Sequence, residues 1–193
     1  MNKILNIYKK TNALLEGHFI LSSGLHSSIY LQSAIVLSYP KYLKMISKNL
    51  GNLIKNKIDV NIIDVVVSPA MGGVIIGSKI GEELNKQSIF LERVNKNLVL
   101  RRGFRIKKNS KIIIVEDVIT TGKSSYECIQ ALQGYKAKVL GVFSIINRSV
   151  KKLDLNVDTY SLLSLEAPLY KESEIPDFLK KTPISKPGSR FLK

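Results

Sequence analysis

Two adjacent carboxylates, Glu116 and Asp117, follow a run of β-branched residues and precede a loop rich in small and hydroxyl-bearing residues. The run, residues 112–115, predicts a short buried parallel strand. Open α/β sheets bind their ligands at the carboxyl ends of the strands, where the two carboxylates would lie. Their oxygens suit sugar hydroxyls or Mg²⁺, while the backbone amides of residues 120–124 suit a phosphate at the start of a helix. These residues predict a sugar phosphate site, and the alternative is an acidic turn with a helix cap.

A second turn of small residues follows another β-branched run. Residues 62–67 predict a buried strand, and a helix ending near Leu84 is expected after the turn. The turn can offer backbone amides to a second anion, because it leads into a helix N-terminus. The alternative is a tight helix start in which the glycines serve packing. The turn consists of Pro69, Ala70, Met71, Gly72 and Gly73.

Arginines are few and clustered, since four of the six lie within thirteen residues: Arg93, Arg101, Arg102 and Arg105. Residues 93–111 hold eight basic residues and no acidic residue. A guanidinium binds phosphate through two parallel hydrogen bonds, so the cluster predicts a local anion site. A solvated basic loop is the alternative.

Strands alternate with helices along the chain, which is typical of a parallel sheet with right-handed crossovers. We expect further helices at residues 3–16, 40–54 and 124–133, and further strands at 88–91, 111–115, 139–146 and 159–163. Gly134 is expected to cap the helix that precedes it. Residues 168–193 contain four prolines and predict one short helix near 176–181 in an otherwise extended tail.

The composition narrows the class of protein. At 193 residues the chain fits one domain with a substantial core, and no apolar run is long enough to predict a membrane helix. The N-terminus lacks the pattern of a signal peptide. The only cysteine, Cys128, is expected to be a buried thiol, which favours a reducing cytoplasm. The net charge of +15 raises nucleic-acid binding, but the lysines responsible are scattered along the chain.

The segment 112–124 resembles the 5-phosphoribosyl-1-diphosphate (PRPP) motif of the type I phosphoribosyltransferases. The resemblance implies an α/β fold whose central, mostly parallel sheet is flanked by helices, with a small N-terminal hood. It implies that Glu116 and Asp117 bind the ribose hydroxyls. It also implies that the 5′-phosphate is bound by Thr120, Thr121, Gly122, Lys123 and Ser124. The turn from Pro69 to Gly73 resembles the diphosphate loop of this family, where we expect a cis peptide bond between Ala70 and Met71.

The N-terminal segment 19–32 is similar to the Phe-x-Leu-x-Ser-Gly-x-x-Ser-x-x-Tyr pattern of orotate phosphoribosyltransferases. In that family the segment covers the pyrimidine, which implies that Tyr30 and Leu31 lie over orotate, with Thr120 beside it. Arg148 falls where the family has an arginine that pairs with the orotate carboxylate. A planar guanidinium suits this carboxylate and would discriminate orotate from uracil.

The basic loop departs from the commonest orotate pattern, because it lacks a His-Gly pair. Gly72 also stands where the family usually has a lysine. The segments at 92–93, 100–104 and 186–190 are similar instead to a second branch of orotate enzymes. The resemblance covers roughly residues 15–190.

As a whole, the resemblance implies transfer of a phosphoribosyl group from PRPP to orotate in pyrimidine synthesis. The residues expected to be catalytic are Glu116, Asp117, Arg93, Arg101 and Arg102. PRPP is expected to carry Mg²⁺ near Asp117, and no protein ligand is assigned to the ion. We expect one domain (1–193), with a core at 39–167 and a hood at 1–38 joined by the tail at 168–193. We also expect a cytoplasmic homodimer whose mobile loop reaches the neighbouring site, with no membrane or nucleic-acid partner.

Two alternatives remain. One is a phosphoribosyltransferase for another base, such as uracil or a purine, which the hood pattern and Arg148 disfavour. The other is a PRPP-sensing regulator that binds nucleic acid on the same fold. The diphosphate loop and the loop arginines disfavour the regulator, whereas the net charge favours it.

Overall fold

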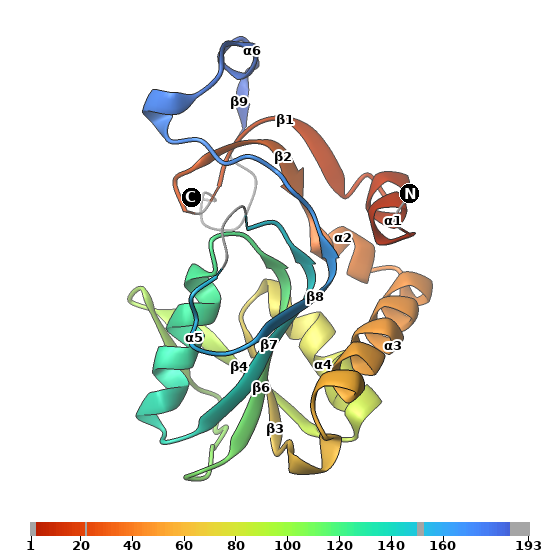
Figure 1. The fold of residues 1–193 in the computed structure, drawn as a ribbon, viewed down its shortest axis with the longest axis vertical. Coiled ribbons are helices and arrows are strands. Elements are labelled where there is room, and N and C mark those ends of the chain that lie inside the picture. Colours follow the sequence, from red (N-terminus) through yellow and green to blue (C-terminus); the bar gives the residue numbers. More distant parts are fainter. Residues whose placement is uncertain (1–2, 22, 150–152, 186–193) are drawn as a thin grey trace.

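The computed structural model describes residues 3–21, 23–149 and 153–185, in which a six-stranded sheet lies beneath a three-stranded one (Figure 1). The order of the large sheet is β5 (Asn97–Leu100), β4 (Gln87–Val94), β3 (Val65–Pro69), β6 (Lys111–Ile119), β7 (Lys138–Asn147) and β8 (Thr159–Ser164). Only the β4–β5 pair of this sheet is antiparallel. The predicted α/β fold with a mostly parallel central sheet is confirmed.

Helices cover both faces of the large sheet. Helices α3 (Pro40–Lys57) and α4 (Gly72–Leu84) lie on one face, and α5 (Lys123–Gly134) lies on the other (Figure 1). Alternate residues of β6 divide between the two cores, since Ile113 packs on the α3–α4 side and Ile114 on the α5 side. The run at 112–115 is therefore apolar throughout because both faces of its strand are buried.

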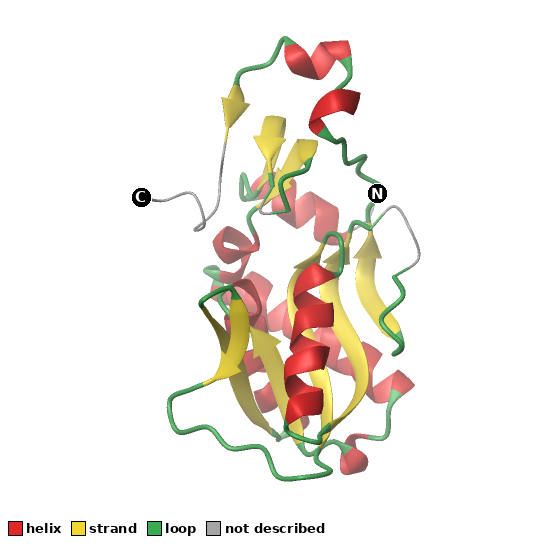
Figure 2. Cartoon of the chain, turned by 90° about the vertical axis from the view of Figure 1, so that its left-hand side faces the viewer, coloured by secondary structure: helices red, strands yellow, loops and turns green. Residues whose placement is uncertain are grey.

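The small sheet forms the hood and lies beyond the carboxyl ends of the central strands (Figure 2). It consists of β1 (Leu14–Ile20) and β2 (His26–Leu31), which are antiparallel, and β9 (Ile184–Ser185), which runs parallel to β1. Strand β9 comes from the tail, so the two ends of the chain meet in one sheet. The remaining helices are α1 (Lys3–Lys10), α2 (Ser33–Leu37) and α6 (Asp177–Lys180), with single 3₁₀ turns at Val60–Ile62 and Glu172–Glu174.

The helix predicted over residues 3–16 is wrong beyond Lys10. Asn12 has a left-handed backbone with a φ of 53°, and β1 begins at Leu14. Leu14 and Glu16 pair with Leu31 and Ile29 of β2. The apolar residues of this stretch fit either a helical face or a strand, and pairing with the next strand, β2, decides between them.

Several other elements begin or end a few residues away from their predicted boundaries. The strand predicted from residue 62 begins at Val65, after the Val60–Ile62 turn. The motif strand continues to Ile119, because β7 pairs with it beyond the carboxylates. Gly134 is the last residue of α5, and Lys136 adopts the left-handed conformation with a φ of 56°, so the predicted glycine cap is wrong. The short tail helix is confirmed as α6.

Three further expectations concern the burial of Cys128, the segment at 186–190 and the membrane-crossing character of the helices. Cys128 is buried against the sheet, as expected. The predicted element at 186–190 lies outside the described residues. Among the helices that the structure describes, none has both the length and the apolar character of a membrane crossing.

Candidate active site

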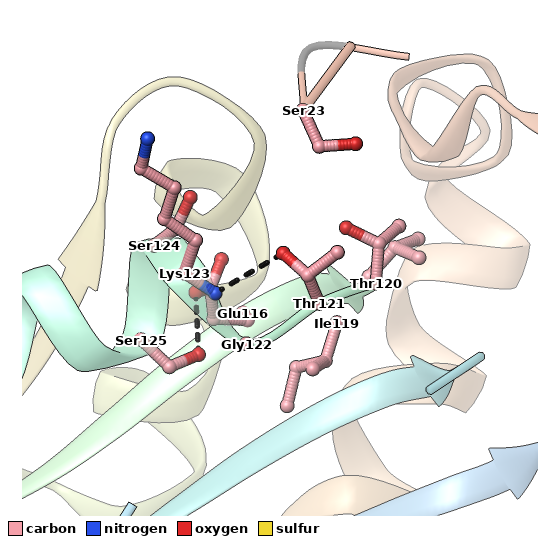
Figure 3. Close-up of a pocket in the computed structure, with 10 residues that line it drawn as sticks. Ser23, Glu116, Ile119, Thr120, Thr121, Gly122, Lys123, Ser124 and Ser125 are labelled. Atoms are coloured by element: carbon pink, nitrogen blue, oxygen red, sulfur yellow. Dashed lines mark hydrogen bonds between the residues drawn. The ribbon is translucent and has the colours of Figure 1, made fainter. Parts of the chain in front are cut away.

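Glu116 lies near the carboxyl end of β6 and faces α5. Its side chain is 6% exposed and accepts a hydrogen bond of 2.8 Å from the Ser125 hydroxyl (Figure 3). Burial raises the pKa of Glu116 to about 8, and the charge of Asp117 adds to this shift, while the Ser125 hydrogen bond opposes it. Burial therefore favours the neutral form of the Glu116 carboxyl. The sequence analysis did not identify Ser125.

Asp117 points to the opposite face of the strand, toward the start of α4. A Cβ atom at position 72 would lie 2.6 Å from its Oδ1, so the carboxylate occupies the space that any other residue than Gly72 would need. Burial raises the pKa of Asp117; backbone amides and the Ser33 hydroxyl oppose this by hydrogen bonding to the carboxylate. The two carboxyl groups therefore point to opposite faces of β6, Glu116 toward α5 and Asp117 toward the glycine turn.

The predicted phosphate loop forms one pocket with Glu116 (Figure 3). Gly122 caps α5 with a φ of 76°, and a Cβ there would lie 2.7 Å from Cδ2 of Leu153. The first amides of a helix have no carbonyl partner within it, so this end of α5 suits an anion. Ser23 reaches the pocket from the hood, and its role was not predicted. The pocket is lined by Ser23, Glu116, Val118, Ile119, Thr120, Thr121, Gly122, Lys123, Ser124 and Ser125.

The second turn joins β3 to α4 beside Asp117. Its Ala70–Met71 peptide bond is cis, as expected. A Cβ at Gly73 would lie 2.8 Å from the carbonyl oxygen of Val115, so this glycine also allows the turn to approach β6 closely. The side chain of Met71 is 76% exposed. The two predicted anion-binding turns therefore lie on either side of the acidic pair, at the edge of the parallel sheet where the sequence predicted them.

The arginines predicted to be catalytic form ion pairs with carboxylates in this structure. Arg93 forms an ion pair with Glu127 of α5. Arg102 Nε donates to Glu92 over 2.6 Å, and Arg101 lies 3.3 Å from the same carboxylate. None of these arginines lines the phosphate pocket. The sequence analysis missed Glu127 as the partner of Arg93, because the spacing of Glu127 four residues after Lys123 predicts only the Lys123–Glu127 ion pair.

Arg148 connects the core to the hood. Its side chain is 1% exposed and donates from Nη1 to the Ile29 carbonyl at 3.0 Å and from Nη2 to the Ser27 hydroxyl at 2.6 Å. Nε has no hydrogen-bond partner among the described residues. Burial lowers the pKa of the Arg148 guanidinium to about 10. A buried cation with an unpaired donor suits an anionic ligand that reaches beneath the hood.

The two predicted hood residues differ in their environments. Tyr30 is half-buried; burial raises its pKa, and so does the charge of Asp117, which indicates that its phenol lies near the acidic pair. Leu31 packs into the core cluster with an exposed fraction of 7%, so in this arrangement only its backbone remains for a ligand. The structure thus brings Tyr30 toward the site and turns the Leu31 side chain away from it.

The site has features that suit Mg²⁺ carried by a phosphate ligand. Mg²⁺ usually keeps several waters and is bound by one or two carboxylates together with substrate phosphates. Asp117 supplies a carboxylate beside the second turn. Within the described residues, no group of three or more His, Cys, Asp or Glu side chains is arranged to hold an ion.

Known proteins are similar to this chain in sequence and in fold. A model of the phosphoribosyl transferase domain matches residues 34–174. An orotate phosphoribosyltransferase of Thermotoga maritima is 47% identical over 190 residues, covering 98% of this chain and 100% of its own. Among solved structures, the fold is similar to an orotate phosphoribosyltransferase of Aeropyrum pernix, with a TM-score of 0.65 and 22% identity over 82% of this chain and 93% of that one. It is also similar to an adenine phosphoribosyltransferase of Thermoanaerobacter pseudethanolicus, with a TM-score of 0.60 and 16% identity over 71% and 88%.

We expect Gly72→Ala to weaken PRPP binding by at least about tenfold, because the new methyl group would displace the Asp117 carboxylate that lies against it. Isothermal titration with PRPP measures the effect. Gly134→Ala is the matched control, since a Cβ there meets nothing within 4 Å. Unchanged PRPP affinity in Gly72→Ala would contradict the close packing of the turn against Asp117.

Proposed function

Because the chain belongs to the phosphoribosyl transferase family, we propose that it transfers the 5-phosphoribosyl group of PRPP to orotate, giving orotidine 5′-monophosphate and diphosphate in pyrimidine synthesis. One observation carries the proposal. The acidic pair lies between two anion-binding turns, with Glu116 beside the phosphate loop and Asp117 against the glycine turn. A ligand with a ribose at its centre, a phosphate at one end and a diphosphate at the other matches this order of groups.

Displacement at the anomeric carbon of the ribose requires positioning and charge stabilisation, and no side-chain nucleophile. The amides of residues 120–124 hold the 5′-phosphate, and the carboxyl groups of Glu116 and Asp117 bind the ribose hydroxyls. The turn from Pro69 to Gly73 holds the diphosphate. Mg²⁺ bound to the diphosphate would neutralise part of the charge that develops on the leaving group. Hood residues around Tyr30 exclude water from the oxocarbenium-like transition state.

The arginines of the β4–β5 hairpin and the loop after it act on the leaving diphosphate. In this structure Arg101 and Arg102 share Glu92, and their side chains are 59% and 63% exposed. Exposed ion pairs contribute only about 0–1 kcal/mol, so exchanging a carboxylate for a diphosphate is energetically accessible. Arg93, held by Glu127, joins this group when the hairpin moves. The hairpin and the loop after it therefore supply arginine side chains that bind the diphosphate.

The choice of base rests on the hood and on Arg148. The solved structures of similar fold include enzymes named for adenine as well as for orotate, so the fold alone does not select a base. The orotate carboxylate is an anion, and Arg148 has an unpaired Nε beneath the hood. A neutral base such as uracil or adenine lacks that charge. With Thr120 and Tyr30, Arg148 makes orotate the preferred acceptor, and a nucleic-acid-binding regulator has no use for this arrangement.

The assay of this proposal is diphosphate release by the purified protein with PRPP and Mg²⁺, with orotate, uracil, adenine and hypoxanthine offered separately. We expect release with orotate alone. Release with another base would refute the choice of orotate and leave the PRPP site in place. Binding of PRPP without release for any base, together with salt-sensitive binding of DNA or RNA, would favour the regulator.

We expect Arg148→Ala to raise the KM for orotate by about a hundredfold while changing the affinity for PRPP much less, because it removes the carboxylate partner. Steady-state kinetics with each substrate varied separates the two effects. Ser27→Ala is the control for the hood contact, since it removes one hydrogen bond and leaves the cation. Equal losses for both substrates in Arg148→Ala would remove this arginine from the base site.

We also propose a cytoplasmic homodimer in which the arginine-bearing hairpin or the loop after it reaches the neighbouring site. Met71 and Ile75 are exposed one turn apart at the start of α4, and the exposed Ile35 lies on α2, which packs on α4. These apolar side chains suit a second copy of the chain. The buried free thiol of Cys128 suits a reducing compartment.

Sedimentation equilibrium should give the mass of a dimer for the wild type and of a monomer for Ile75→Glu, because a charge would then face the apolar contact. Mixing Arg101→Ala with Asp117→Asn should restore activity if the loop serves the neighbouring site, since one site of a mixed dimer then has both groups. A monomeric wild type would contradict the dimer. A dimer without restored activity would contradict the shared site.

A further inference from the structure

A buried hydrogen bond joins the acidic pair to the helix that follows the phosphate loop. The Ser125 hydroxyl donates to Oε1 of Glu116 over 2.8 Å (Figure 3). Ser125 is 1% exposed and Glu116 is 6% exposed. A buried carboxyl group costs stability unless it is hydrogen-bonded, so the contact could serve the fold alone. The surroundings of the two residues indicate a further role.

The two oxygens of the Glu116 carboxyl group differ in their environments. Within the described residues, Ser125 donates the one hydrogen bond that this group accepts, and it goes to Oε1. Oε2 accepts no hydrogen bond there, and it is not enclosed, because Glu116 lines the pocket of the phosphate loop. One oxygen is thus held on α5, and the other remains for a ligand in the pocket.

Ser125 also belongs to the turn that is proposed to bind phosphate. It is the third residue of α5, which begins at Lys123, and it lines the same pocket as Glu116. The first amides of a helix have no carbonyl partner within it, so they suit the 5′-phosphate of PRPP. Ser125 therefore has its backbone in the phosphate-binding turn and its hydroxyl on a carboxyl group that binds ribose.

A glutamate side chain has several rotatable bonds, and fixing them costs conformational entropy. A hydrogen bond that fixes the side chain before the ligand binds removes part of this cost from the binding step. We propose that Ser125 is a positioning residue whose hydroxyl holds Oε1 of Glu116 on α5, so that Oε2 is directed at a ribose hydroxyl of PRPP. This inference rests on the proposed function.

A positioning role and a purely structural role predict different measurements. A serine that only supports the packing of α5 on the sheet would affect the affinity for every ligand equally or not at all. A serine that acts through Glu116 affects ligands that carry a ribose, and only while the Glu116 carboxyl group is present. Inorganic phosphate, which has no ribose, separates the two roles.

The first variant is Ser125→Ala, which removes the hydroxyl and keeps the backbone amide. We expect the dissociation constants for PRPP and for ribose 5-phosphate to rise about tenfold, the effect of losing one hydrogen bond to a charged group. The dissociation constant for inorganic phosphate should stay within about twofold, because the amides of the turn remain. Isothermal titration measures all three. Unchanged PRPP affinity, or equal losses for the three ligands, would overturn the proposal.

Ser47→Ala is the matched control. Ser47 is a completely buried serine on α3, and its hydroxyl donates to Glu83 of α4 over 3.3 Å. The variant therefore removes the same kind of contact outside the phosphate pocket. It should leave the three dissociation constants unchanged. A tenfold loss of PRPP affinity in this control as well would assign the effect of Ser125→Ala to general destabilisation and overturn the proposal.

A double-mutant cycle with Glu116→Ala tests whether Ser125 acts through Glu116. Adding Ser125→Ala to Glu116→Ala should leave the PRPP affinity unchanged, and a further loss would overturn the proposal. Ser125→Cys gives an independent test should Ser125→Ala fold poorly, since a thiol fills the space and is a weaker donor. Its PRPP affinity should fall below that of the wild type, and an unchanged affinity counts against the positioning role.

Titration of PRPP into the wild type distinguishes failure of this inference from failure of the proposed function. A wild type that does not bind PRPP contradicts the proposed function. A wild type that binds PRPP and transfers its phosphoribosyl group to orotate, with a Ser125→Ala variant that binds PRPP equally well, contradicts the positioning role alone.

Discussion

The close approach of the glycine turn to β6 is the constraint on which the rest of the site depends. Asp117 and Val115 of the strand lie where a Cβ of residue 72 or 73 would otherwise be, so only glycines bring α4 this near. Because of that approach, the diphosphate turn and the acidic pair belong to one site. The phosphate loop joins them from the other face of the same strand, where Ser125 bonds to Glu116. A single strand end thus organises three binding elements.

Burial of ionisable groups is the second feature of this arrangement. Two adjacent carboxyl groups are held where burial raises the pKa of both, and a guanidinium is buried nearby with a donor that has no partner among the described residues. Buried charges without partners cost stability. The proposed ligand, with its hydroxyl, phosphate and carboxylate groups, supplies hydrogen-bond partners at these positions.

The hood is connected to the core by contacts that end at the site. Arg148, which directly follows β7, donates hydrogen bonds to Ile29 and Ser27 of β2. The backbones of His26 and Tyr170 form a bridge that attaches the tail to the hood, and β9 extends the same sheet. The N-terminal strands and the tail, which are far from the motif in sequence, therefore form one sheet beyond the carboxyl ends of the central strands.

The sequence by itself determined the local elements: the motif strand with its loop and helix, the glycine turn, and the alternation that predicts a parallel sheet. These follow from patterns within about a dozen residues, because strand burial, turn geometry and helix starts depend mainly on neighbouring residues. Only the tertiary structure decided that the tail adds β9 to the hood, that Glu127 pairs with Arg93, and that Arg148 is buried beneath the hood. Each of these depends on contacts between segments distant in the chain, which local periodicity does not specify because many partners would satisfy the same pattern.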